Sequence, residues 1–149
     1  MSGPLNYTTS IEPGKSAAEC IAVLARHGAT AVAMTYDNGL PGGLSFQVET
    51  AFGKRAYALP ANVEGTHAVL QKAQRAGKIP RNKATLEQAQ RTCWRVVKVW
   101  LEAQLALIEA GLVDLPQVML PFMITDEGRT VYQRFLENER LALTAGGAS

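Results

Sequence analysis

The 149-residue sequence has only two cysteines and two histidines, too few for a disulfide framework or for the clustered ligands of a zinc site. Cys20 and Cys93 fall on helical patterns among apolar neighbours, which indicates buried thiols that pack as small hydrophobic side chains. His27 is expected at a helix end and His67 within a helix, each without a set of further ligand residues around it. No nucleophile–base set or phosphate-binding glycine loop is recognisable either. We therefore expect no metal, no cofactor and no enzymatic activity.

Long uninterrupted apolar runs are also missing. The most apolar stretch, residues 96–110, is broken by charged residues such as Lys98 and Glu102. A helix that crosses a bilayer needs about 20 mostly apolar residues. Residues 1–9 are polar and lack the apolar centre of a secretory signal. The sequence predicts no membrane partner and a cytoplasmic location.

The sequence has enough apolar residues for one hydrophobic core. They make up 47% of the chain, and a chain of this length buries about two-thirds of its unfolded surface. We expect a single domain over residues 1–149. Within it we expect a unit of helix, strands and helix over 1–76, a basic connector over 77–84, a helical portion over 85–143 and a loose tail over 144–149.

The first unit combines two kinds of periodicity. Residues 6–11 are β-branched and aromatic and predict a short first strand. Ser16 and Glu19 form a capping-box pattern that predicts a helix ending near residue 27. Alternating residues predict strands over 30–36, 44–50 and 55–59, with turn signals over 37–43 and at Gly53. Asn62 then begins a predicted helix over 63–76.

The helical portion begins with a second capping box, Thr85 to Gln88, ahead of a long helix over 86–110. The second half of this helix is apolar nearly all round, which is typical of a helix in a core or in an oligomer. Asp114 and Thr130 begin two more predicted helices. We predict an α+β fold. It has a three-stranded antiparallel meander, a fourth N-terminal strand, flanking helices, a long central helix and a helical C-terminal third.

Positive charge is concentrated in one part of the chain. Residues 72–98 carry eight cations opposed only by Glu87, so this segment is +7 although the whole chain is only +2. On the long helix the cations follow a spacing of three or four residues and form one polar stripe. A basic connector that leads into a basic helix face is suited to contacts with phosphates. The candidate nucleic-acid-binding residues are Lys78, Arg81, Lys83, Arg91, Arg95 and Lys98.

Residues 90–111 resemble a family of small proteins found in bacteriophages and prophages. The shared pattern is Trp-Arg-x-x-Lys-x-Trp-x-Glu-Ala-Gln, here Trp94, Arg95, Lys98, Trp100, Glu102, Ala103 and Gln104. Shorter matching pieces begin at Tyr7, Leu44, Leu59 and Leu120. Val99 departs from the pattern, which usually has an acidic residue before the second Trp. The resemblance implies a bacterial host and a setting of phage replication or recombination, and it implies no particular activity.

Two functions remain open from the sequence. The first is a phage-type accessory protein that binds nucleic acid through its basic segment. The second is a protein–protein adaptor or inhibitor, or an oligomeric subunit, with Trp94 and Trp100 at an interface with a host or phage protein or with another copy. The apolar residues around the two tryptophans favour core positions for both, and the interface role is the alternative. A third interpretation of the basic stripe is a solvated helix face neutralised by acidic residues from the C-terminal third of the chain.

Overall fold

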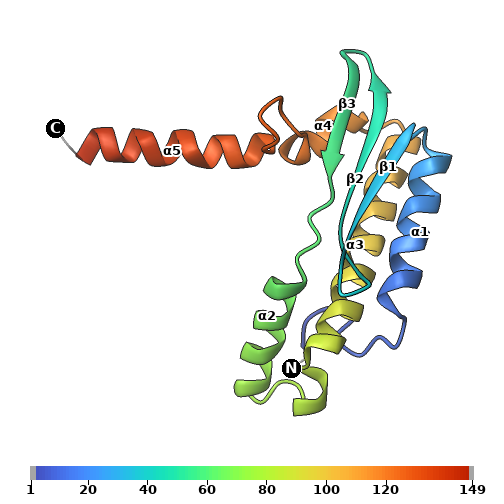
Figure 1. Ribbon diagram of the computed structural model, residues 1–149, viewed down its shortest axis with the longest axis vertical. Coiled ribbons are helices and arrows are strands. Elements are labelled where there is room, and N and C mark those ends of the chain that lie inside the picture. The colour runs from blue at the N-terminus through green and yellow to red at the C-terminus, as the bar shows by residue number, and fades with distance from the viewer. Residues whose placement is uncertain (1–2, 148–149) are drawn as a thin grey trace.

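The computed structural model describes residues 3–147 and confirms the α+β class (Figure 1). The elements along the chain are α1 (Pro13–Arg26), β1 (Ala31–Asp37), β2 (Leu40–Thr50), β3 (Gly53–Ala58), α2 (Val63–Arg75), η1 (Arg81–Lys83), α3 (Leu86–Glu109), α4 (Leu115–Met119), η2 (Leu120–Phe122) and α5 (Val131–Gly147).

The three strands form an antiparallel sheet in the order β1-β2-β3, and α1 and α3 lie side by side against the sheet (Figure 1). The first hairpin turns more tightly than the glycine-rich sequence predicts. Asn38 and Gly39 both have positive φ, as a two-residue hairpin turn requires. Pro41 therefore belongs to β2, at the bulge opposite Thr35 and Tyr36, where a residue without an N–H is tolerated.

The predicted fourth strand over residues 6–11 is wrong. Residues 5–8 form turns, and Asn6 has a φ of 62°, which interrupts an extended run. The backbone carbonyls of this segment are hydrogen-bonded to side chains of α3 and not to a strand. Gln88 Nε2 donates to the carbonyls of Tyr7 and Thr9, and Thr92 Oγ1 donates to that of Asn6.

The predicted capping box at Ser16 is also wrong, because α1 begins three residues earlier at Pro13. Proline suits the first turn of a helix, where its missing N–H has no partner to lose. The other N-cap residues are confirmed, but the capping box at Thr85 forms only in part, because the side chain of Gln88 bonds to Tyr7, Thr9 and Arg91 and not to the N–H of Thr85. Asn62 and Thr85 accept from the backbone N–H three residues later, and Thr130 and Gln133 cap α5 reciprocally.

The main core lies between the sheet, α1 and α3, and its largest fully buried side chains include Phe46, Tyr57 and Trp94. A smaller cluster, formed by Leu70, Ala73, Ile79 and Ala89, joins α2 to α3. Both cysteines are buried, as predicted. One side of the apolar half of α3, with Val97, Leu101 and Leu105, therefore lies in the core of this chain, whereas Val99 and Leu107 are exposed.

The C-terminal helix differs from the sequence prediction. The predicted loose tail began at residue 144, but α5 continues through Gly147, and residues 148 and 149 lie outside the described range. This helix projects away from the rest of the molecule, and its main contact is with η2 (Figure 1). No helix within residues 3–147 is long and apolar enough to cross a membrane.

Candidate nucleic-acid interface

The six cations predicted from the sequence fall into two groups in the structure. Arg91, Arg95 and Lys98 lie on α3, on the side that faces α1. The other three belong to the connector between α2 and α3. The two groups differ in burial and in the partners that their side chains have.

Arg95 is the most enclosed cation of the α3 group, with only 11% of its side chain exposed. Its Nη2 donates to Ser16 Oγ at 2.9 Å and to Glu19 Oε2 at 3.2 Å, and its Nε donates to the same hydroxyl at 3.2 Å. Ser16 is fully buried, so this serine is an acceptor for the guanidinium and not a helix cap. Arg95 is therefore a structural link between α1 and α3.

Lys98 continues this link one turn along α3. Its Nζ lies 2.6 Å from Glu102 Oε1 and 3.4 Å from Glu19 Oε2. The hydrogen bond to Glu102, assisted by Glu19, raises the pKa of Lys98 despite partial desolvation. Desolvation alone would raise the pKa of Glu19, but the charges of Arg95 and Lys98 lower it below its usual value. Lys98 and Glu19 therefore stabilise each other's charged forms at neutral pH.

Arg91 makes the weakest contacts of the α3 group. Its Nε lies 3.3 Å from Glu12 Oε1, and its Nη1 lies 3.3 Å from Gln88 Oε1. The partners of the α3 cations thus come from α1, from the residue before it and from α3 itself. The sequence interpretation of acidic partners from the C-terminal third holds only for Glu102. The other partners, Glu12 and Glu19, come from the N-terminal part of the chain, because α5 projects away from α3 while α1 packs along it.

The connector group is accessible. Lys78 and Arg81 are exposed and Lys83 is half-exposed, and two further exposed cations, Lys72 and Arg75, precede them at the end of α2. None of these five forms an ion pair within residues 3–147, and residues 72–84 contain no acidic residue. We call this set the basic connector patch: Lys72, Arg75, Lys78, Arg81 and Lys83.

The backbone under the basic connector patch is ordered by local contacts. Gly77, with a φ of 74°, ends α2, and the backbone N–H of Lys78 donates to the carbonyl of Ala73. The buried side chain of Ile79 anchors the connector to the cluster between α2 and α3. The 3-10 turn η1, which begins at Arg81 and ends at Lys83, then gives the backbone of these two residues a regular conformation. The sequence prediction did not assign Lys72 and Arg75 to the site, although the lack of acidic residues from 72 to 84 already marked them.

The two tryptophans of the family-like motif have different surroundings. Trp94 is fully buried, and its Nε1 donates to the carbonyl of Pro41 at 2.9 Å. Trp100 is half-buried and packs edge-to-face on Phe122 with ring centroids 5.4 Å apart. The predicted interface role of Trp94 is wrong, because its indole lies inside the main core. Trp100 joins α3 to η2.

The two cysteines and His27 make packing or structural contacts. Burial raises the pKa of Cys20 to about 11 and also raises that of Cys93, so neither thiol is ionised to a useful extent at neutral pH. His27 contacts the carbonyl of Val23 and the carboxylate of Glu109, which ties the end of α1 to the end of α3. Within residues 3–147, no three His, Cys, Asp or Glu side chains are grouped so that they could hold a metal ion.

Exposed cations also occur singly elsewhere, such as Arg26 and Lys54, but the densest run of them lies in residues 72–83, where α2 ends and the connector begins. Figure 1 shows this end of α2. The same end carries no metal-ligand set among the described residues. Comparisons with models of protein families, with curated proteins and with solved structures found no match to this chain.

Proposed function

We propose that the protein is a non-enzymatic accessory protein of phage type that binds nucleic acid through the basic connector patch. The observation that carries the proposal is the contrast in pairing. The five cations of the patch have no anionic partner among the described residues, whereas Arg91, Arg95 and Lys98 each have one. The proposal places the protein in the cytoplasm of a bacterial host, where phage nucleic acid is replicated and recombined.

The chemistry of such a patch is electrostatic. Each Lys or Arg that neutralises a phosphate releases a condensed counterion, so affinity falls as salt rises, with a log–log slope of about −0.9 per contact on duplex DNA. Phosphate contacts fix the position of a protein on the backbone and carry no sequence information. We therefore expect binding that depends strongly on salt and little on base sequence.

The distribution of the remaining charge orients the protein. The whole chain is +2, so the part outside the five cations carries −3. A polyanion is attracted to the patch and repelled by the more acidic surfaces, which favours approach from the connector end. The modest net charge also implies moderate affinity.

The first experiment is a titration of labelled single- and double-stranded oligonucleotides with the full chain, followed by fluorescence anisotropy at low and moderate salt. If all five cations contact phosphates of duplex DNA, the slope of log affinity against log salt approaches about −4.5. Absence of binding at low salt would refute the proposal, and binding that ignores salt would refute the phosphate contacts.

A pair of charge-reversal variants localises the interface. We expect Arg81→Glu with Lys83→Glu to weaken binding and to make the salt slope less steep by about 2. The control is Arg26→Glu with Lys54→Glu, which changes net charge equally at exposed positions on α1 and β3. Equal weakening in both double variants would mean that overall charge matters and the patch does not.

A further inference from the structure

The C-terminal helix α5 has an apolar face that is largely uncovered within residues 3–147. Successive helical residues turn by about 100°, which places Tyr132, Phe135, Leu136 and Leu143 on one side of the helix. All but Leu136 are exposed. Helices of this length are marginal in water unless an apolar face packs against something. The long exposed face therefore requires a partner from outside the chain.

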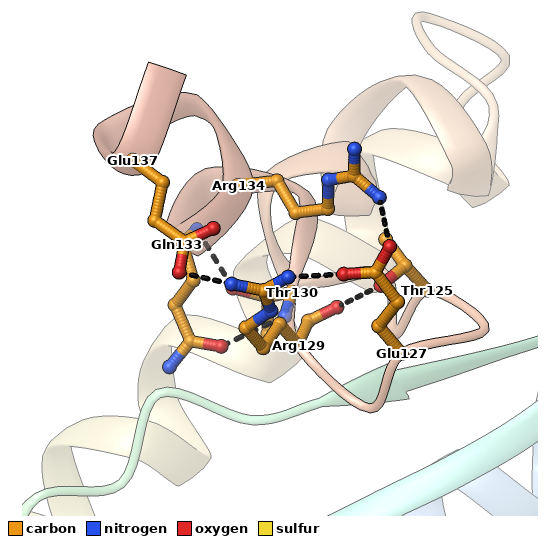
Figure 2. A network of polar contacts seen from close by, with 7 residues as sticks. All are labelled: Thr125, Glu127, Arg129, Thr130, Gln133, Arg134 and Glu137. Carbon is orange, nitrogen blue, oxygen red and sulfur yellow. Dashed lines mark hydrogen bonds and ion pairs between the residues drawn. The ribbon is translucent and has the colours of Figure 1, made fainter. Parts of the chain in front are cut away.

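The direction of α5 is fixed at its base. Arg129 bridges Glu127 and Glu137, and Arg134 Nη1 donates to Glu127 Oε1 at 3.0 Å (Figure 2). The Thr125 hydroxyl closes the preceding turn by donating to the carbonyl of Arg129 at 2.7 Å. These contacts lie in the turn over residues 125–130 and in the first two turns of the helix. They order this turn and the start of α5, and the backbone N–H of Ile124, just before the turn, donates to the carbonyl of Ala56 in β3. From this base α5 extends away from the other elements (Figure 1).

The chain also carries an apolar groove at its opposite end. This groove lies between α2 and α3 beside the N-terminal segment and has a volume of about 490 Å³. Its apolar lining consists of Pro4, Leu5, Pro60, Val69, Val96 and Val97. Leu5 and Val69 are both more than half exposed, so apolar surface is open to solvent here. Pro4 and Val69 also line a neighbouring hollow of about 330 Å³, whose wall includes Lys72 and Lys78.

We propose that this groove receives α5 of a second copy of the chain. The apolar face of α5, from Tyr132 to Leu143, extends over about 16 Å and fits the binding of an amphipathic helix in a groove between two helices. A chain cannot fill its own groove, because α5 leaves the molecule beyond the far end of α3 (Figure 1). In a pair of chains, the apolar face of α5 from one copy covers the groove of the other, and no further protein is needed.

Charge complementarity supports the same partner. Glu139 lies on the apolar face of α5, between Phe135 and Leu143 along the helix, and forms no ion pair within residues 3–147. Lys72 and Lys78, at the end of the groove, are likewise without ion pairs in that range. An α5 seated in the groove brings the unpaired carboxylate toward the unpaired ammonium groups. The pairing fixes the direction in which the helix enters.

The contact is proposed to be reciprocal, so that each chain inserts its α5 into the groove of the other. A single helix face buries little surface, whereas stable protein interfaces bury about 1,600 Å² in total. Two chains that exchange α5 form two copies of the contact and close with two-fold symmetry. The proposal therefore specifies a homodimer. It goes beyond nucleic-acid binding and does not depend on it. In the dimer Lys72 and Lys78 pair with Glu139 of the second copy, so Arg75, Arg81 and Lys83 are the cations of the patch that stay available to phosphates.

The test is the mass of the full chain in solution over a range of concentrations, measured by analytical ultracentrifugation. We expect a dimer at micromolar concentration. Either Phe135→Ser with Leu143→Ser on the helix, or Val69→Glu in the groove, should raise the dimer Kd more than about tenfold, since each removes apolar burial worth well over one power of ten in affinity. Circular dichroism and urea unfolding of each variant verify that the fold persists.

The matched control is Leu141→Ser. Leu141 is as exposed as Leu143, at 68% against 75%, but it lies on the opposite side of α5. This variant should leave the dimer Kd unchanged. Glu139→Lys should weaken the dimer, and addition of Lys72→Glu should restore part of the affinity.

A monomer at all concentrations overturns the proposal, including the case in which α5 binds a different protein. A dimer that resists Val69→Glu but is lost with the α5 variants means that α5 pairs with α5, which also overturns the groove. The α5 variants retain all five cations of the basic connector patch. Their oligonucleotide binding therefore separates failure of the dimer from failure of the proposed function.

Discussion

The two halves of the basic segment are both positive in the sequence, +5 over residues 72–84 and +2 over residues 85–98, but they have different surroundings in the structure. The five cations from Lys72 to Lys83 lie on the surface without ion pairs in the described part of the chain. The three from Arg91 to Lys98 lie between α1 and α3 and contact Glu12, Glu19 or Glu102.

The difference teaches that a density of charge does not by itself define a binding surface. Two of the carboxylates that pair with the α3 cations, those of Glu12 and Glu19, are far away in the sequence. They reach these cations only because α1 packs along α3. Cations on a connector that no other element covers keep their charge available. Four predictions test the difference between the two groups of cations, in order of decreasing expected effect on stability.

The largest effect on stability is expected for Arg95→Ala. Removal of the guanidinium leaves the buried Ser16 hydroxyl without its donor and leaves Glu19 with only its longer contact to Lys98. Loss of a largely buried charged partner costs about 3 kcal/mol. Urea unfolding monitored by tryptophan fluorescence measures the change. A variant as stable as the parent would show that the contact between α1 and α3 does not depend on this arginine.

The ion pairs of Glu19 also predict a pH dependence. Its pKa is lower in the folded chain than in the unfolded one, so the stabilisation is present at neutral pH and is lost as pH falls through the folded pKa. We expect the urea midpoint of the parent to decrease below about pH 4.5, where unfolded carboxylates begin to bind protons. Glu19→Gln should have a lower midpoint at neutral pH and a shallower acid dependence. An unchanged acid dependence in that variant would assign the effect to other carboxylates, such as Glu127, whose pKa is lowered chiefly by its hydrogen bond with Arg129.

A smaller effect is expected for Lys98→Met. The methionine keeps much of the aliphatic packing of the lysine but loses the contacts with Glu19 and Glu102, which are partly exposed to solvent. A loss of about 1 kcal/mol is expected for a partly screened pair of this kind. Urea unfolding at low and high salt checks it, and the difference between parent and variant should shrink as salt screens the pairs.

The smallest effect on stability is expected for Arg81→Ala, below about 0.5 kcal/mol, because the exposed guanidinium has no ion pair within residues 3–147. In oligonucleotide titrations the same variant should bind more weakly and make the salt slope less steep by about 1. Arg91→Ala is the matched comparison on α3, and we expect its oligonucleotide affinity to stay near that of the parent. The reverse order of affinities would move the interface from the connector to α3.

Local signals in the sequence predicted much of the fold. Asn62, Thr85 and Thr130 begin their helices because each side chain caps backbone N–H groups only a few residues away. The alternation in residues 44–50 identifies β2 because one side of that strand faces the core. Lys78, Arg81 and Lys83 could be assigned to an accessible site because no acidic residue is near them in the sequence.

Tertiary contacts decided the rest. The segment at residues 6–11 has the composition of a strand, but its carbonyls are bound by Gln88 and Thr92, more than 75 residues away in the chain. Ser16 has the spacing of a helix cap, but it lies inside α1 and accepts from Arg95. In both cases the hydrogen-bond partner is distant in the sequence, so local propensity predicts a strand or a cap that does not form.

Neighbouring residues in the sequence were enough to predict the helices, most of their caps, the three strands and the segment of highest positive charge. Tertiary packing determined which cations lack ion pairs within residues 3–147 and placed Trp94 in the core. It also left α5 in contact mainly with η2, with most of its apolar face exposed in that range. Pairing and burial depend on which elements pack together. Which elements pack together depends on the apolar faces of whole helices and of the sheet, so no single residue in the sequence reveals it.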